Sequence, residues 1–140
     1  MKTKGFENLR VYQIAEELSD LLWDIVSGWE QFSKDSVGRQ LVRAIDSIGA
    51  NIAEGAGRRS FQDNRRFIKI ARGSLNETRH WLRRAHRRRI LSSSQTESLK
   101  PLLRALGPML NAYLKSIGST ATNRFDQEPT TKDRGQRTDE

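Results

Sequence analysis

Residues 36–57, SVGRQLVRAIDSIGANIAEGAG, decide the fold. Apolar side chains recur in this stretch every three or four residues, at Val37, Leu41, Ala44, Ile45, Ile48 and Ile52. This spacing places one apolar seam along a helix, as in helices that pack lengthwise against one another. Gly55 and Gly57 then break the pattern. The stretch therefore predicts an amphipathic helix from about Ser36 to Ala56.

Three further segments have the same helical periodicity, and none of them alternates with the period of two that a strand requires. They run from about Asn8 to Ser27, from Ser60 to about Arg89, and from Ser94 to about Ile117. Gly28 is placed to end the first of these, and Ser60 and Ser94 are placed as helix N-caps. Pro108 is expected to kink the last helix or to start it afresh.

Four amphipathic helices joined by short loops predict an all-α fold, an antiparallel up-down-up-down four-helix bundle. We assign residues 1–118 to this bundle. Residues 119–140 are rich in Thr, Asp, Arg and Gln and have no periodicity, so we interpret them as a disordered polar tail. A length of 140 residues fits one domain.

Composition excludes several classes of protein. The chain has no cysteine, so it has no disulfide framework, zinc ribbon, iron–sulfur site or thiol nucleophile. No apolar run approaches the ~20 residues that span a bilayer, so we expect no contact with a membrane. The N-terminus leads into no signal-like apolar core, and the expected compartment is the cytoplasm.

The charge is concentrated in one segment. Lys and Arg number 25 against 17 Asp and Glu, a formal net charge of +8. Residues 58–89 alone hold 12 basic and 2 acidic residues, a net charge of +10, whereas residues 1–57 have a net charge of −3. These 12 residues are the candidate nucleic-acid contacts: Arg58, Arg59, Arg65, Arg66, Lys69, Arg72, Arg79, Arg83, Arg84, Arg87, Arg88 and Arg89.

On a helix, six of these cations share one narrow sector about six turns long: Arg65, Lys69, Arg72, Arg79, Arg83 and Arg87. Solvated helix faces usually alternate the sign of charge at i,i+4, and like charges at that spacing repel each other. A polyanion would relieve the repulsion, because the planar fork of arginine binds two phosphate oxygens at once. Carboxylates of a neighbouring helix or subunit, such as those of the acidic first helix, would relieve it as well. The residues leave both explanations open.

Nothing in the sequence indicates an enzyme. Glu77 and His80 have the Glu-x-x-His spacing of di-iron bundles, but such a site needs two of these pairs and two further glutamates. The glycines of residues 55–59 lack the lysine and the hydroxyl residue of a phosphate-binding loop. We therefore expect no catalytic residue, no metal and no cofactor.

A second group of polar residues lies beside the seam of the second predicted helix. It consists of Gln40, Ser47, Asn51 and Glu54. These residues form either a polar margin that hydrogen-bonds to a neighbouring helix or a strip that contacts another subunit or a ligand.

Three stretches resemble the 23S rRNA intervening-sequence protein family. They are residues 40–44 (QLVRA), residues 47–55 (SIGANIAEG) and residues 67–77 (FIKIARGSLNE), and the opening residues 6–12 (FENLRVY) fit as well. The resemblance covers about residues 6–117. It implies an antiparallel four-helix subunit that assembles as a ring-like homopentamer. It also implies kinship with accessory factors of diversity-generating retroelements, which bind nucleic acid and a reverse transcriptase. The family contributes no catalytic residues.

Together these observations predict a non-enzymatic, oligomeric protein that binds RNA or DNA phosphates through its third helix. The run of arginines over residues 83–89 exceeds what the family pattern implies and strengthens this hypothesis. The alternative is a protein–protein interaction scaffold whose arginine-rich helix pairs with acidic surfaces of other subunits or partners.

Overall fold

The computed structural model describes residues 5–119, and this part of the chain is entirely helical between its turns. Its four long helices are α1 (Arg10–Ser27), α3 (Arg39–Ala56), α4 (Phe61–Arg87) and α5 (Ser93–Ser116). Three short elements accompany them: η1 (Phe6–Asn8), α2 (Gln31–Ser33) and η2 (Lys34–Gly38). The prediction of an all-α, four-helix fold is confirmed. Of the predicted tail, only Ser119 lies within the described residues.

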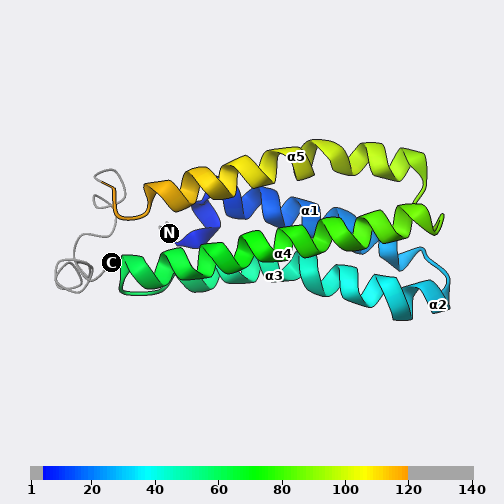
Figure 1. The fold of residues 1–140 in the computed structure, drawn as a ribbon, viewed down its shortest axis with the longest axis horizontal. Helices are drawn as coiled ribbons and strands as arrows, with labels where there is room; N and C mark the ends of the chain where they lie inside the picture. Colours follow the sequence, from blue (N-terminus) through cyan, green and yellow to red (C-terminus); the bar gives the residue numbers. More distant parts are fainter. Residues whose placement is uncertain (1–4, 120–140) are drawn as a thin grey trace.

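The four long helices lie side by side along one axis, and successive ones run in opposite directions (Figure 1). α3 packs against α1 and α4, and α5 packs against the same two helices, so each long helix has two neighbours. The turns between α1 and α2 and between α4 and α5 lie at one end of the bundle (Figure 1). The turn between α3 and α4 lies at the other end.

The second predicted helix begins earlier than the sequence indicated. α2, the π-helical turn η2 and α3 follow one another without a break from Gln31, not from Ser36. The carboxylate of Glu30 caps this start by accepting hydrogen bonds from the backbone N–H groups of Phe32 and Ser33, at 3.2 and 3.0 Å. Glutamate is not among the preferred N-cap residues, so capping rules do not predict this start.

The last helix differs from its prediction in two ways. Its N-cap is Ser92, not Ser94, and Ser92 and Gln95 form a reciprocal capping box. A single helix runs through both Pro101 and Pro108, so the expectation of a restart at Pro108 is wrong. Both prolines face solvent, where water can satisfy the carbonyl groups that lose their helical partner.

The four long helices enclose one apolar core. Its fully buried aliphatic side chains include Leu18, Leu22, Leu41, Ile45, Ile48, Ile52, Ile68, Leu99, Leu106 and Leu110. Each stabilises the fold by about 1.5–3 kcal/mol relative to an exposed position. α3 and α4 approach most closely at Gly55, where an added Cβ would lie 2.6 Å from Oδ1 of Asn64 and 3.0 Å from Cβ of Phe67. Within residues 5–119, no helix combines the length and apolar character that a membrane crossing requires.

Candidate nucleic-acid interface

Eight of the twelve candidate cations lie in helix α4, and Arg88 is its C-cap. The eight are Arg65, Arg66, Lys69, Arg72, Arg79, Arg83, Arg84 and Arg87. Arg58 and Arg59 precede the helix and Arg89 follows it. All twelve are exposed except Arg65 and Arg84, which are half-buried. The helix starts where sequence predicts, because the hydroxyl of Ser60 accepts a hydrogen bond from the backbone N–H of Asp63 at 3.0 Å.

Three arginines of the narrow sector predicted on this helix form hydrogen bonds to α5 or to the residue that follows it. Arg65 donates to the backbone carbonyl of Ile117 at 3.0 Å, and Arg72 donates to Oδ1 of Asn111 at 3.0 Å. A guanidinium nitrogen of Arg79 lies 3.5 Å from the backbone carbonyl oxygen of Leu103. These acceptors are neutral oxygens. They fix the position of the arginines, and within residues 5–119 neither Arg72 nor Arg79 has a carboxylate within salt-bridge distance.

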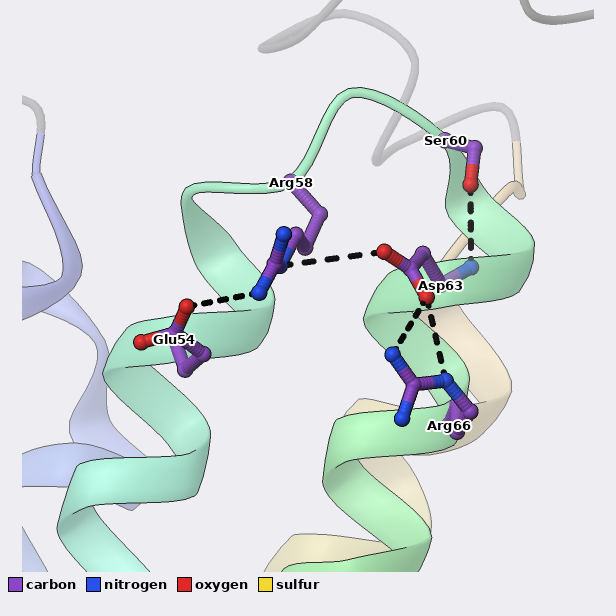
Figure 2. Close-up of polar contacts among 5 residues, drawn as sticks. All are labelled: Glu54, Arg58, Ser60, Asp63 and Arg66. Carbon is purple, nitrogen blue, oxygen red and sulfur yellow. Dashed lines mark hydrogen bonds and ion pairs between the residues drawn. The ribbon is translucent and has the colours of Figure 1, made fainter.

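At the turn between α3 and α4, by contrast, the basic residues meet carboxylates (Figure 2). We call this group the paired cluster: Glu54, Arg58, Asp63 and Arg66. Arg58 lies 2.7 Å from a carboxylate oxygen of Glu54 and 3.7 Å from one of Asp63. Arg66 lies 2.8 Å from the other oxygen of Asp63.

The paired cluster also rests on an aromatic ring. The guanidinium carbons of Arg58 and Arg66 lie 4.8 and 4.5 Å from the centre of the Phe67 ring. Cations favour the negative face of such a ring. Two carboxylates and one ring therefore contact the two arginines, and the formal charges of the paired cluster sum to zero.

The other end of α4 carries a different arrangement. We call Arg83, Arg84, Arg87, Arg88 and Arg89 the open cluster. Within residues 5–119, none of the five has a carboxylate within salt-bridge distance or a side-chain hydrogen bond. The partial negative charge at the C-terminus of α4 offsets part of their mutual repulsion. In the part of the chain that the structure describes, the open cluster is thus a group of five uncompensated charges at the C-terminal end of α4.

The backbone at the end of α4 is also unusual. Arg89 has φ = 63°, in the left-handed region where glycine is normally found. Its N–H donates to the carbonyl of His86 at 3.0 Å, and the N–H of Ile90 donates to that of Ala85 at 2.9 Å. These two bonds form a Schellman motif. An arginine at this position costs about 1–2 kcal/mol relative to glycine.

Two acidic residues at this end of the bundle, Glu30 and Asp35, have other partners. Glu30 belongs to the turn before α2, at the same end as the last turn of α4 (Figure 1). Hydrogen bonds from the hydroxyl of Ser33 and from the N–H groups of Phe32 and Ser33 lower the pKa of Glu30. Asp35 accepts from Gln31 at 2.9 Å and lies 3.6 Å from Arg39. Both carboxylates are engaged near their own position in the chain.

The polar strip predicted beside the seam of α3 divides into separate parts. The hydroxyls of Ser47 and Ser74 lie 2.6 Å apart across the α3–α4 interface, and Asn51 donates to the carbonyl of Ser47 at 2.8 Å. Glu54 belongs to the paired cluster. Gln40 is half-buried and has no hydrogen-bond partner within residues 5–119. The strip is not one continuous surface.

Glu77 and His80 both contact Trp81. Glu77 accepts a hydrogen bond from the indole N–H of Trp81 at 3.3 Å, and the His80 ring lies edge-on to the Trp81 ring, 4.8 Å between centres. Across residues 5–119, no three His, Cys, Asp or Glu side chains are grouped closely enough to hold a metal ion.

The sequence did not identify the residues that divide the cations into two groups. Phe67 is half-buried, and its ring contacts two arginines. The acceptors on α5, Asn111 and the carbonyl of Leu103, depend on the packing of two helices far apart in the chain. The local spacings of two ion pairs were visible in the sequence, i,i+3 for Asp63 and Arg66 and i,i+4 for Glu54 and Arg58.

The structure thus defines a class: a small, basic, all-helical bundle protein with an arginine-rich face and with neutralisation confined to one end of that face. Comparison with known proteins identifies the family. Residues 7–112 match the family described as 23S rRNA-intervening sequence protein, and the chain belongs to it. No curated protein matches the chain.

Proposed function

We propose that the protein binds the phosphate backbone of RNA or DNA through the open cluster, without catalysing a reaction. One observation carries the proposal: five arginines at the C-terminal end of α4 have no acidic partner within residues 5–119, whereas Arg58 and Arg66 have two. Uncompensated guanidinium groups lower their free energy by binding phosphate oxygens, and the released counterions add to the affinity.

Recognition of this kind depends on charge and shape. The open cluster contains no aromatic side chain on which a row of bases could stack. Backbone contacts position a protein on nucleic acid without reading its sequence. Membership of the 23S rRNA-intervening sequence protein family favours RNA as the first ligand to test.

Assembly would strengthen binding. We propose a homo-oligomer, for which the family resemblance implies a pentamer, acting in the cytoplasm with a reverse transcriptase as a further partner. Five chains with a net charge of +8 each would carry about +40, and a field of that size attracts polyanions over a Debye length or more.

Binding of wild-type protein to fluorescein-labelled duplex RNA tests the proposal. The protein is purified in high salt until its A260/A280 ratio shows no bound nucleic acid, and Kd is then measured at several salt concentrations. We expect log Kobs to fall linearly with log[salt], with a slope of about −0.9 for each phosphate contacted. Absence of binding at low salt would refute the proposal.

An interaction scaffold is the second candidate, favoured by two exposed aromatic side chains. Trp23 on α1 is 60% exposed and Phe32 on α2 is 76% exposed. Aromatic side chains are enriched in the cores of protein–protein interfaces. Light scattering with and without RNA separates the two candidates, because a scaffold keeps the same mass when RNA is added.

A further inference from the structure

The groove between α4 and α5 lies directly beside the open cluster. It has a volume of about 400 Å³. Its floor includes the aliphatic side chains of Leu82, Leu91, Leu99 and Leu103, and its rim includes Arg79, Arg83, His86 and Lys100. α4 packs less closely against α5 than against α3, which leaves room for the groove.

The rim has unused capacity for an anion. Within residues 5–119, Arg83 and His86 have no hydrogen bond or ion pair through their side chains. Arg79 reaches only neutral oxygens. Lys100 lies 2.9 Å from Glu97, in a pair that is largely exposed and therefore weak. An anion at the rim would lie near three cationic side chains, one imidazole and the carboxylate of Glu97.

The floor of the groove is apolar, because its side chains are leucines. Leu82, Leu91 and Leu99 are at most 7% exposed, and Leu103 is half-buried. A ligand that satisfies both surfaces has a compact apolar or planar part and a phosphate attached to it. An acidic peptide would need a longer apolar track than a groove of this size provides.

We propose that this groove holds one unpaired nucleotide of a bound RNA strand, its base over the leucine floor and its phosphate at the Arg79–Arg83 rim. The imidazole of His86 and the guanidinium of Arg83 offer planar surfaces on which a base can stack. The inference rests on the proposed function. It adds a preference for RNA with an extruded nucleotide over perfect duplex RNA.

Two RNA duplexes that differ only by a single-nucleotide bulge test the proposal, with Kd measured by fluorescence anisotropy at fixed salt. We expect wild-type protein to bind the bulged RNA about fivefold more tightly, at the low end of what stacking one base contributes. Arg83→Gln removes a rim cation and should abolish this preference. Arg87→Gln is the matched control, because Arg87 is one turn further along α4, equally unpaired and outside the groove. It should weaken binding to both RNAs and keep their ratio.

Methyl NMR of the full chain gives an independent readout. We expect 5′-AMP to shift the Leu91 and Leu103 methyl signals and inorganic phosphate to leave them unchanged. Equal Kd values for both RNAs in wild-type protein, or a preference that survives Arg83→Gln, would overturn the groove assignment and leave backbone binding intact. Failure to bind either RNA would overturn the proposed function itself. Displacement of bulged RNA by an acidic leucine-containing peptide, with no response to 5′-AMP, would assign the groove to a protein partner instead.

Discussion

The two ends of α4 carry arginines in opposite electrostatic situations. At the N-terminal end, Arg58 and Arg66 share Asp63 and rest on the ring of Phe67. At the C-terminal end, the five arginines of the open cluster have no such partners within residues 5–119. The same residue type therefore serves to join α3 to α4 at one end and is available to an external anion at the other. Counting arginines along a sequence does not distinguish the two cases.

The largest effect on stability is expected at the paired end, where α3 and α4 approach most closely. Gly55→Ala should destabilise the bundle by about 1–2 kcal/mol, because the clash with Asn64 and Phe67 outweighs the better helix propensity of alanine. Urea unfolding followed by circular dichroism measures the change. Gly73→Ala is the control: an added Cβ there meets nothing within 4 Å, so this variant should be more stable than wild type. A neutral or stabilising Gly55→Ala would contradict the close approach.

At the open end, Arg89→Gly should stabilise the protein by about 1 kcal/mol, which raises Tm by roughly 4 °C in a domain of this size. Arg89→Ala removes the same charge but keeps a side chain in the left-handed region. If the two variants melt at the same temperature, the backbone of Arg89 is not strained.

Asp63→Asn should remove one of the two carboxylates that neutralise the paired cluster. Arg66 loses its carboxylate and Arg58 keeps only Glu54. We expect affinity for duplex RNA at low salt to rise about two- to threefold, with a steeper salt slope. Glu17→Gln makes the same change in net charge on the exposed surface of α1. If both variants raise the affinity equally, net charge alone explains the effect.

The smallest effect is expected for Glu30, the carboxylate at the open end that serves as a helix cap. The pKa of Glu30 is lowered by hydrogen bonds from Ser33 and Phe32, so its contribution to stability is present above its unfolded-state pKa and is lost as the pH falls through its lower folded-state pKa. Glu30→Gln should therefore be less stable than wild type at pH 7, and the difference should shrink in acid. Unfolding curves at a series of pH values measure it. A difference that is independent of pH would show that the carboxylate is not the active form of the cap.

Much of the fold was predictable because it depends on local periodicity. The seam of α3 and the cap at Ser60 follow from spacing within one helix. Errors arose at two positions where the usual local rules for helix starts and helix breaks do not hold. Glu30 begins a helix that the sequence placed at Ser36, and Pro108 continues one because its face is exposed to water.

The candidate site was predictable only as a set of residue types. Sequence placed the cations on one helix and showed the local spacings of Glu54 with Arg58 and of Asp63 with Arg66. It did not show the contacts of Arg58 with Asp63 and with the Phe67 ring, because these depend on how the turn between α3 and α4 folds. The leucine groove beside the open cluster was likewise invisible, because its walls come from residues on α4 and α5 that only the folded chain brings together.

A comparison of two double variants tests most directly whether the open cluster, and not the paired cluster, binds nucleic acid. Arg87→Gln with Arg88→Gln removes two charges from the open cluster, and Arg58→Gln with Arg66→Gln removes two from the paired cluster. We expect the slope of log Kobs against log[salt] for duplex RNA to become shallower by nearly two in the first variant and to change by less than about 0.5 in the second. Equal changes in the two variants, or a larger change in the second, would contradict the assignment of the open cluster as the binding surface.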